Sequence, residues 1–316
     1  PQPHLIQRMT DQLTHRGPDH GDSVSYPFQE YWMGLGHRRL SVIDLSSQAN
    51  QPMEYNALTI VFNGEIYNYL EIKEELLKSG YQFRTQSDTE VVLRAYEKWG
   101  EECLKKFNGM WAFAVWDSQK KQLFLSRDRF GKKPLFYFKD ENKLVFASEM
   151  KALYSFLPKV IPNFEVVLKA KSDVFSYEAS EECLIKWIKR FPPGSFGIYC
   201  KGDLKIQRFW NIEIDKNTPI KYEDQVEYFR DLFIDSCRLR MRSDVALGTA
   251  LSGGVDSSLL STYGVELGNP KTLVAVNHIG KEQISHDLIA FEKILNKKVN
   301  VVNVDAITYA GFLPKC

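Results

Sequence analysis

The sequence predicts two domains of different fold class, an antiparallel α+β domain over residues 1–212 and a parallel α/β domain over residues 213–316. Between residues 110 and 148 strand-like segments follow one another directly, which is typical of antiparallel sheets. After residue 221 helical and strand patterns alternate, which is typical of a parallel sheet. A length of 316 residues fits two domains, because single cores stop growing near about 250–300 residues. Residues 211–221 contain few large apolar side chains and are predicted to link the domains.

In the first domain, helices flank several strands, which predicts a layered α+β arrangement. Residues 69–79 form an amphipathic pattern ended by Gly80, and Ser-Asp-Thr-Glu at 87–90 is predicted to start a second helix. A third helix is predicted over residues 178–190. The predicted strands cover residues 31–45, 56–67, 110–117, 122–128, 135–139 and 143–148, followed by a hairpin over 195–200 and 204–210.

The second domain is predicted to open with a long helix over residues 222–242. A glycine-rich turn over residues 252–256 joins the first strand of this domain to the helix that follows it. The predicted strands cover residues 245–251, 273–276 and 299–304, and they alternate with helices over 257–267 and 287–295.

The composition excludes several classes of protein. Forty-one Lys and Arg against 40 Asp and Glu give a formal net charge of +1, which argues against binding of nucleic acid or an anionic membrane through bulk charge. No apolar run approaches the roughly 20 residues of a membrane-spanning helix. Five scattered cysteines without CxxC spacing predict a reducing compartment, and we expect a cytoplasmic protein.

The most specific local pattern is Leu-Ser-Gly-Gly-Val-Asp-Ser-Ser over residues 251–258, between a predicted strand and a predicted helix. Two glycines permit a tight turn, and the helix N-terminus directs N–H groups toward an anion. The serine hydroxyls add donors, so the loop is suited to pyrophosphate. It lacks the lysine of a Walker A loop. The alternative is an ordinary glycine turn with serine and aspartate capping of the helix.

Five short motifs stand in order in the first 150 residues. Each alone has an ordinary structural explanation as a turn, a helix N-cap or a surface cation, but chance explains their order and spacing poorly. They are His-Arg-Gly-Pro-Asp at 15–19, His-Arg-Arg-Leu-Ser-Val-Ile-Asp at 37–44, Asn-Gly-Glu-Ile-Tyr-Asn at 63–68, Ser-Asp-Thr-Glu at 87–90 and Arg-Asp-Arg-Phe-Gly at 127–131.

Together with the loop at 251–258, this set resembles the glutamine-dependent asparagine synthetases. The resemblance implies a class II glutamine amidotransferase (glutaminase) domain over residues 1–212, of N-terminal-nucleophile (Ntn) type with layered α/β/β/α antiparallel sheets. It implies a PP-loop ATP-pyrophosphatase synthetase domain, apparently incomplete, over residues 213–316. The likeness is strong over residues 10–150, and it is loose over residues 155–190 and after 277.

The resemblance also implies roles for five residues of the first domain. Arg39 would pair with the α-carboxylate of glutamine, because a planar guanidinium suits a planar anion. Glu65 and Asp88 would accept hydrogen bonds from the α-ammonium. The Asn63 side-chain amide and the Gly64 N–H would form the oxyanion hole for the tetrahedral intermediate.

The nucleophile of this family is an N-terminal cysteine whose α-amine acts as general base. The sequence opens on Pro1 and contains no such residue. We expect a first strand beginning Cys-Gly to precede Pro1. The alternative is an inactive relative that has lost its nucleophile.

The implied reaction has two stations. Glutamine is hydrolysed through a thioester at the first, and at the second ATP adenylates a carboxylate that ammonia then attacks, with Mg²⁺ neutralising the leaving pyrophosphate. No metal-ligating side chains are predicted. The predicted ATP- and pyrophosphate-binding residues are Leu251, Ser252, Gly253, Gly254, Asp256, Ser257, Ser258 and Val276.

The acceptor acid is expected to be aspartate, which would give asparagine. A uronic acid or other sugar carboxylate of surface-polysaccharide synthesis is the alternative, because the sequence after Val276 departs from the family pattern and no residue identifies the acceptor. We expect glutamine, ATP and the acceptor carboxylate as small-molecule partners, with no nucleic acid and no membrane. Family analogy suggests a homodimer.

Overall fold

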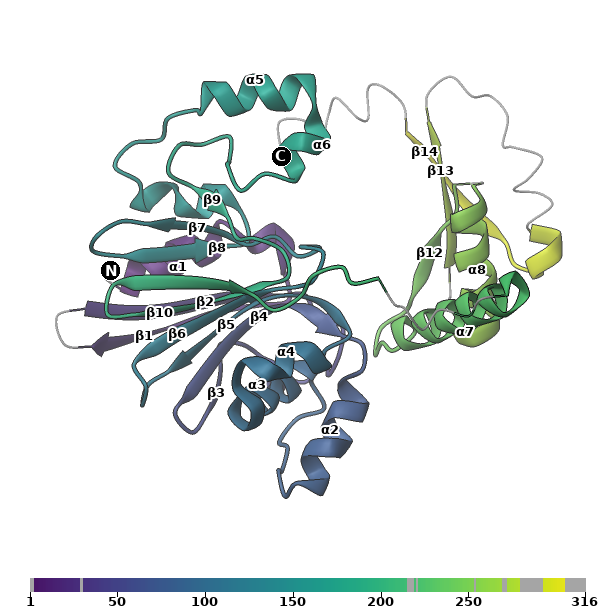
Figure 1. Cartoon of the computed structure of the whole chain (residues 1–316), viewed down its shortest axis with the longest axis horizontal. Coiled ribbons are helices and arrows are strands. Elements are labelled where there is room, and N and C mark those ends of the chain that lie inside the picture. The colour runs from purple at the N-terminus through teal and green to yellow at the C-terminus, as the bar shows by residue number, and fades with distance from the viewer. Residues whose placement is uncertain are drawn as a thin grey trace. The chain divides into compact units, whose positions relative to one another are not determined.

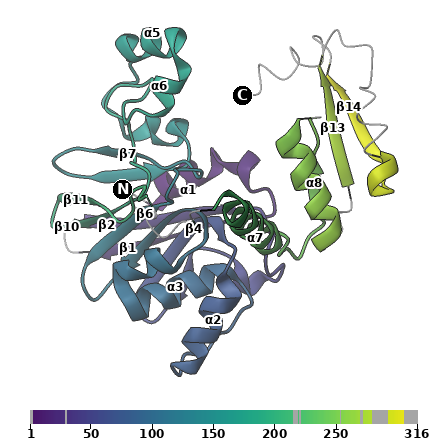
Figure 2. The ribbon, with the colours of Figure 1, turned by 45° about the vertical axis from the view of Figure 1, so that its right-hand side comes forward.

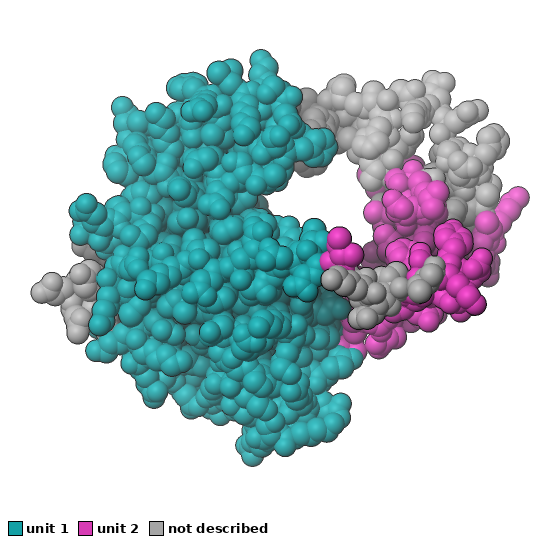
Figure 3. Space-filling view, viewed as in Figure 1, with its two compact units in different colours: residues 1–213 teal, residues 214–316 magenta. Residues whose placement is uncertain are grey.

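The structure is a computed structural model of the chain, and it describes residues 3–28, 31–214, 219, 221–252, 254–268, 272–278 and 292–304. The chain divides into two compact units, residues 1–213 and residues 214–316, which Figure 3 shows in different colours. Each unit has its own sheets and helices.

The centre of unit 1 is a six-stranded antiparallel sheet with the strand order β11-β10-β6-β5-β4-β3. Strands β4 and β5 pair along their whole length, from Leu58 opposite Asp117 to Ile66 opposite Gly109. The antiparallel class predicted for this region is therefore confirmed. The strands are β3 (Met53–Tyr55), β4 (Leu58–Ile66), β5 (Gly109–Asp117), β6 (Gln122–Arg127), β10 (Ser195–Cys200) and β11 (Asp203–Arg208).

One face of this sheet is covered by helices α2 (Tyr69–Lys78) and α3 (Asp88–Trp99), as Figures 1 and 2 both show. The even-numbered side chains of β4, such as Ile60 and Phe62, join the same buried cluster as the α3 residues Val91 and Leu93. The helix start predicted at residues 87–90 is confirmed, and its N-cap is Ser87, whose hydroxyl accepts a hydrogen bond from the Thr89 N–H at 3.1 Å.

The opposite face of the sheet packs against a second layer of strands. Odd-numbered residues of β4 and even-numbered residues of β5, such as Val61 and Ala114, cluster with Leu35 and Leu135 of this layer. The layer consists of a hairpin, β1 (His20–Phe28) with β2 (Tyr31–Arg39), and a three-stranded sheet of order β8-β7-β9, with β7 (Phe136–Lys139), β8 (Leu144–Ala147) and β9 (Lys189–Arg190).

A final layer of helices covers the outer side of these strands. It contains α1 (Pro3–Asp11) and the 3-10 helix η4 (Met150–Phe156). Val145 and Ala147 of β8 pack there against Leu153, with Met9 of α1 beside them. Unit 1 thus has helices on both outsides and two layers of strands between them.

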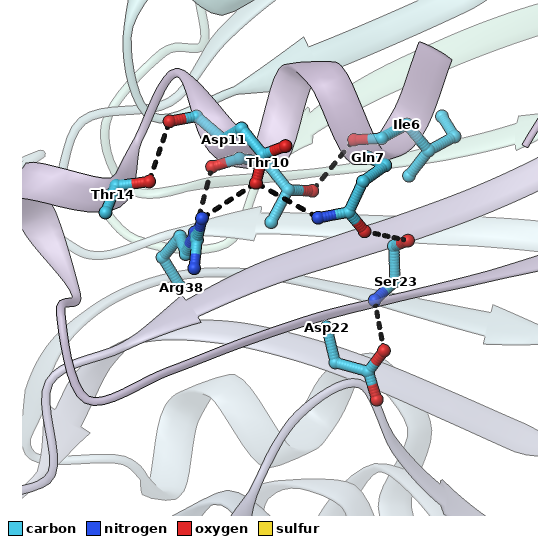
Figure 4. Close-up of polar contacts among 8 residues, drawn as sticks. All are labelled: Ile6, Gln7, Thr10, Asp11, Thr14, Asp22, Ser23 and Arg38. Atoms are coloured by element: carbon cyan, nitrogen blue, oxygen red, sulfur yellow. Dashed lines mark hydrogen bonds and ion pairs between the residues drawn. The ribbon is translucent and has the colours of Figure 1, made fainter. Parts of the chain in front are cut away.

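Helix α1 is held along the β1–β2 hairpin by polar contacts that Figure 4 shows. The Arg38 guanidinium donates to Asp11 Oδ1 at 2.7 Å, and the Ser23 hydroxyl donates to Gln7 Oε1 at 3.0 Å. Neither α1 nor β1 was predicted from the sequence, because residues 1–30 carry mixed polar patterns without clear periodicity.

The predicted helix over residues 178–190 is wrong. Residues 189–190 form β9, whose Arg190 lies opposite Phe136 of β7. The Arg190 guanidinium donates to the carbonyls of Tyr177, Glu178 and Ser180, so the preceding chain folds around a side chain that local periodicity does not reveal. The remaining helices of unit 1 are α4 (Cys103–Lys106), α5 (Phe164–Ser172) and α6 (Val174–Glu178), with 3-10 helices η1 (Thr14–Arg16), η2 (Ser47–Ala49) and η3 (Gly100–Glu102).

Unit 2 contains a three-stranded parallel sheet of order β12-β13-β14, which confirms the predicted parallel pairing. Leu251, directly after β12, is 2% exposed and packs with Val299 of β14. Part of the helix predicted over 287–295 lies outside the described residues. The elements are α7 (Tyr222–Arg240), β12 (Gly248–Ala250), α8 (Val255–Gly268), β13 (Thr272–His278) and β14 (Val299–Val304).

Within the ranges that the structure describes, no helix combines the length and the apolar character needed to cross a membrane.

Candidate functional site

Strand β4 is paired on both edges only at its beginning. β3 pairs with residues 58–60, whereas β5 continues along β4 to Ile66. Beyond residue 60, side chains take the place of a strand: the Phe62 N–H donates to Gln51 Oε1 at 2.6 Å, and the Ile66 N–H donates to Asp88 Oδ2 at 3.0 Å. Both N–H groups therefore point to the edge away from β5.

The N–H of Gly64 lies on this same edge, because alternate residues of an antiparallel strand direct their N–H groups the same way. Among the described residues, no hydrogen bond to this N–H is found on that edge. A side chain at position 64 is excluded, since a Cβ there would lie 2.2 Å from the Met110 carbonyl oxygen. Gly64 thus offers a backbone donor in the half-buried part of an otherwise buried strand.

Asn63 lies next to this donor, and its side chain points to the layer of β7 and β8. The Asn63 Nδ2 is 3.5 Å from the Ser148 hydroxyl, directly after β8. The two residues predicted as oxyanion-hole donors, Asn63 and Gly64, are adjacent on one strand, and Asn63 borders the space between the two layers of strands.

His37 on β2 lies beside these residues, with Nε2 3.1 Å from the Phe62 carbonyl oxygen. Burial lowers the pKa of His37 to about 4, so the ring is neutral and its Nε2 carries the proton that the carbonyl accepts. The Nδ1 atom is then a buried acceptor, and it has no hydrogen-bond partner among the described residues.

Asp88, the first residue of α3, is 5% exposed. Burial raises the pKa of Asp88 to about 6, although the Ile66 N–H and other hydrogen bonds favour the charged carboxylate. A cation beside this carboxylate would recover the energy lost by burial. Its position is therefore suited to an ammonium group, as the resemblance implies.

Arg39, at the end of β2, is 6% exposed and lies within electrostatic reach of Asp88. Its Nη1 donates to the Ser46 carbonyl and to Asn50 Oδ1, both at 2.8 Å, and its Nη2 donates to the carbonyls of Ile43 and Asp44. These donors hold the loop that follows β2. Binding of a glutamine carboxylate by Arg39 stays a prediction. It requires some of the guanidinium N–H groups to donate to the carboxylate as well as to the loop.

Glu65 lies half-buried on β4, on the same face as Asn63. Its carboxylate acts on Lys133, whose pKa is lowered by burial and by Arg16 while Glu65 and Asp128 oppose that shift. The structure therefore brings Glu65 to the loop over residues 127–133. Its predicted contact with an α-ammonium stays a prediction.

Several residues that shape this region were not assigned from the sequence. Asp128, 1% exposed, accepts hydrogen bonds from the N–H groups of Trp111, Phe130, Lys132 and Lys133, which fixes the loop beside Glu65. Glu149 binds His15 at 2.8 Å and Arg16 at 3.1 Å. No sequence pattern pointed to Gln51, Ser148 or Glu149, because each contacts residues that are distant in the chain.

Three of the described cysteines are buried and have raised thiol pKa values. Burial raises the pKa of the Cys103 thiol, and it raises that of Cys183 to about 11. Burial also raises the pKa of Cys237. In the part of the chain that the structure describes, no group of three or more His, Cys, Asp or Glu side chains could hold a metal ion.

In unit 2, the predicted anion loop joins β12 to α8. The Ser257 hydroxyl accepts from the Ser252 N–H at 3.1 Å, contacts the Ser252 hydroxyl at 2.9 Å and donates to the Gly254 carbonyl at 3.1 Å. A Cβ built on Gly254 would meet nothing closer than 3.6 Å, so a ligand can reach this backbone. Asp256 is exposed and Ser258 is half-buried.

Two of the predicted residues of this loop region are less fully described. Gly253 lies outside the described residues, and of Val276 only its place in β13 is known. Leu251 is buried beneath the loop, which indicates a packing role.

One solved structure has a fold similar to that of the chain. The solved structure of the glutamine phosphoribosylpyrophosphate amidotransferase from B. subtilis, complexed with ADP and GMP, is similar to it with a TM-score of 0.52 and 14% sequence identity. The match covers 97% of this chain and 89% of that chain. At this low identity the likeness concerns the fold alone.

The family follows from the sequence comparison. A family model described as a glutamine amidotransferase domain matches residues 1–210, and the chain therefore belongs to that family. A second model, described as asparagine synthase, matches residues 228–288.

Curated relatives match across both units. Asparagine synthetase (glutamine-hydrolyzing) 1 of Bacillus subtilis is 38% identical over 323 aligned positions, covering 99% of this chain and 49% of the relative. Asparagine synthetase (glutamine-hydrolyzing) 3 of the same organism is 37% identical over 284 positions, covering 88% and 43%. The chain spans about half the length of the curated relatives it matches.

Proposed function

We propose that unit 1 hydrolyses glutamine and that unit 2 is part of an ATP-dependent synthetase, which joins the released ammonia to a carboxylate. The Gly64 N–H carries this proposal: it lies on the open edge of β4, next to the Asn63 amide. Two comparisons support the proposal. The glutamine amidotransferase family model matches residues 1–210, and the curated relatives are named asparagine synthetases. The α/β/β/α layering is that of an Ntn-type amidotransferase domain.

At the first station a thiolate attacks the side-chain carbonyl of glutamine, ammonia leaves, and water hydrolyses the resulting thioester. The tetrahedral intermediate places its negative oxygen between the Asn63 amide and the Gly64 N–H. Asp88 and Glu65 bind the α-ammonium, and Arg39 binds the α-carboxylate. Burial raises the pKa of the Cys103 and Cys183 thiols, which argues against either of them as the source of this thiolate.

At the second station residues 252–258 bind the pyrophosphate part of ATP. The loop fits this group, because Gly254 leaves its backbone accessible and α8 begins at Val255 with its N–H groups toward the loop. The hydroxyls of Ser257 and Ser258 and the backbone of Ser252 orient the anion. Mg²⁺, when bound, would neutralise phosphate charge, and the exposed Asp256 carboxylate is the oxygen ligand that this loop offers.

Aspartate is the proposed acceptor, because the curated relatives carry the name asparagine synthetase. The test incubates the full-length protein with glutamine, ATP and Mg²⁺ and measures glutamate, AMP and pyrophosphate with each candidate acid. AMP formed with aspartate and absent with glucuronate supports the proposal. The opposite result replaces the acceptor with a sugar carboxylate, and no glutamate with any acid contradicts the glutaminase. We further propose a cytoplasmic homodimer, which light scattering would test.

A further inference from the structure

Helix α5 of unit 1 has nine residues, and the described part of the chain buries none of them. Helix α3, by comparison, buries all of residues 88–96. A helix this short is marginally stable in water, because helices in proteins are stabilised chiefly by packing an apolar face. In Figures 1 and 2, α5 and α6 lie at the outer end of unit 1, beyond the sheet that contains β7. The apolar face of α5 therefore needs a packing partner that the described residues do not supply.

The two sides of α5 differ in what they face. A small pocket of about 190 Å³ lies between α5 and residues 177–182, and α5 lines it with Glu165, Val166 and Lys169. With about 3.6 residues per turn, the side opposite the pocket carries position 164 and the positions three, four and seven residues further on. These residues are Phe164, Val167, Leu168 and Lys171. Three apolar side chains and one lysine thus face away from the pocket.

Helix α6 extends this apolar side. Its Tyr177 is buried and lines the same pocket, whereas Phe175 lies about 200° further around the helix and is 83% exposed. Phe164 and Leu168 of α5 are 68% and 67% exposed. We call the exposed apolar residues of the two helices the outer patch. They are Phe164, Val167, Leu168, Val174 and Phe175.

The outer patch is large enough for a stable protein interface. At roughly 150–250 Å² for a whole aromatic side chain and less for an aliphatic one, its five residues expose on the order of 500 Å². Monomeric proteins rarely expose contiguous apolar patches larger than a few hundred Å². A standard interface buries roughly 800 Å² on each partner, of which about 60% is apolar. The outer patch therefore supplies the apolar area that such an interface requires.

The outer side of α5 is complementary to itself. When two copies of α5 pack antiparallel about a two-fold axis between residues 167 and 168, Val167 lies opposite the partner's Leu168. Phe164 then lies opposite the partner's Lys171, whose stem covers apolar surface and whose ammonium group is attracted to the ring. In a parallel pair, Lys171 would instead meet the same lysine of the partner at like charge. A two-fold interface requires this kind of self-complementarity, which the antiparallel pair provides.

We infer that the outer patch is the interface of a homodimer, in which it packs against the outer patch of a second copy with the two α5 helices antiparallel. The inference rests on the homodimer proposed above and names the surface that forms it. Each α5 then packs the apolar face that its own chain leaves exposed. The patch lies within residues 164–175 and contains none of the residues predicted to act on glutamine, so dimerisation and glutamine hydrolysis are separate readouts.

Sedimentation velocity of the full-length protein measures the dissociation constant of the dimer. Leu168→Glu places a carboxylate among apolar side chains beside the two-fold axis, so the dissociation constant should rise at least about 100-fold. Phe175→Ser removes an exposed ring without adding a charge, and the constant should rise at least about tenfold. Leu77→Glu is the matched control, because Leu77 is 50% exposed on α2, and it should leave the constant unchanged.

Disulfide trapping tests the direction of the helices. With diamide as the oxidant, a mixture of the Phe164→Cys and Lys171→Cys variants should give a crosslinked dimer above the wild-type background, and neither variant alone should do so. Crosslinking of each variant with itself indicates parallel helices and overturns the antiparallel arrangement. A mixture that stays at the background level overturns it too.

The other outcomes separate the interface from the proposed function. A dissociation constant that is unchanged in Leu168→Glu and Phe175→Ser, or that rises equally in Leu77→Glu, overturns the outer patch as the interface and leaves the homodimer intact. If Leu168→Glu lowers the thermal midpoint with the dimer unchanged, the patch is covered within one chain, which also overturns the interface. A wild type that is monomeric at every concentration overturns both. Glutamate release is measured on the same samples, and its absence from the wild type contradicts the glutaminase alone.

Discussion

The two candidate sites present backbone N–H groups to a negative charge in different ways. In unit 1, the Gly64 donor lies on the open edge of β4, and its neighbours on that edge are held by Gln51 and Asp88, 11 and 22 residues away from their partners. In unit 2, the loop contacts of Ser252, Gly254 and Ser257 span at most five residues. The first site depends on the whole domain, and the second depends on one turn and one helix.

This difference predicts which properties a substitution in each site should change. A substitution that disturbs unit 1 should affect stability and glutamine hydrolysis together, because the same long-range contacts hold the fold and the donor. A substitution in the loop of unit 2 should affect the ligand with little effect on stability, because the contacts are local and exposed.

The largest effect is expected for Gly64→Ala. Its Cβ would lie 2.2 Å from the Met110 carbonyl oxygen, so β4 and β5 must separate. We expect glutamine hydrolysis by the full-length protein to fall at least about 100-fold, and the unfolding free energy to fall by about 1–3 kcal/mol. Gly254→Ala in unit 2 is the control for glutamine hydrolysis, since its Cβ would meet nothing closer than 3.6 Å. Unchanged hydrolysis in Gly64→Ala would show that this edge is not the oxyanion site.

Asp88→Asn should change how stability depends on pH. The folded state raises the pKa of Asp88 from 3.8 to about 6, so the stability this group contributes is full below about pH 4 and is lost as the pH rises through about 6. The Asp88→Asn variant has no group that titrates at this position, so it does not lose this stability as the pH rises. Relative to the wild type, its unfolding free energy in urea should rise by at most about 3 kcal/mol between about pH 4 and pH 7.

The matched control for this experiment is Asp203→Asn, which removes an exposed carboxylate at the first residue of β11. Its stability should follow the wild type at every pH. Parallel curves for Asp88→Asn and the wild type would contradict the buried, proton-retaining state of Asp88.

Ser257→Ala tests the local site. It removes the hydroxyl that joins Ser252 to Gly254, so pyrophosphate release by the full-length protein should fall about 10–100-fold, as expected for lost hydrogen bonds near a charged group. Glutamate formation and thermal stability should stay unchanged. Ser261→Ala, one turn further along α8, is the control because its buried hydroxyl has no described partner. Equal loss of both activities would contradict two separate stations.

Gln51→Ala should give the smallest effect and sharpen the comparison most. It leaves the Phe62 N–H without its side-chain acceptor, whereas the Phe62 carbonyl keeps the hydrogen bond from His37, and the unfolding free energy should fall by about 1–2 kcal/mol. Glutamine hydrolysis should fall as well, since Gly64 is two residues further along the same edge. Gln122→Ala is the control, because the Gln122 amide makes a long contact, 3.4 Å from its Nε2 to the Tyr96 hydroxyl. If Gln51→Ala lowers stability but keeps full glutamine hydrolysis, the site does not depend on Gln51 holding the open edge of β4 in place.

The sequence alone determined the features that are written locally in the chain. Strands in direct succession predicted the antiparallel sheet, and strands alternating with helices predicted the parallel sheet. The segment 87–90 predicted the start of α3. The contiguous pattern over residues 251–258 predicted a loop between a strand and a helix, and its binding of an anion stays a prediction. The resemblance to the asparagine synthetases implied Asn63 and Gly64 as a pair of oxyanion-hole donors, and this role stays a prediction.

Only the tertiary structure decided what depends on distant residues. It showed that Gln51 and Asp88 take the place of a strand beside β4, that Glu149 binds His15 across 134 positions, and that residues 178–190 do not form one helix. It also showed that the described part of the chain buries no residue of α5. Periodicity reports which face of a segment is apolar, but not which segment meets it, because pairing is decided by the packing of the whole domain.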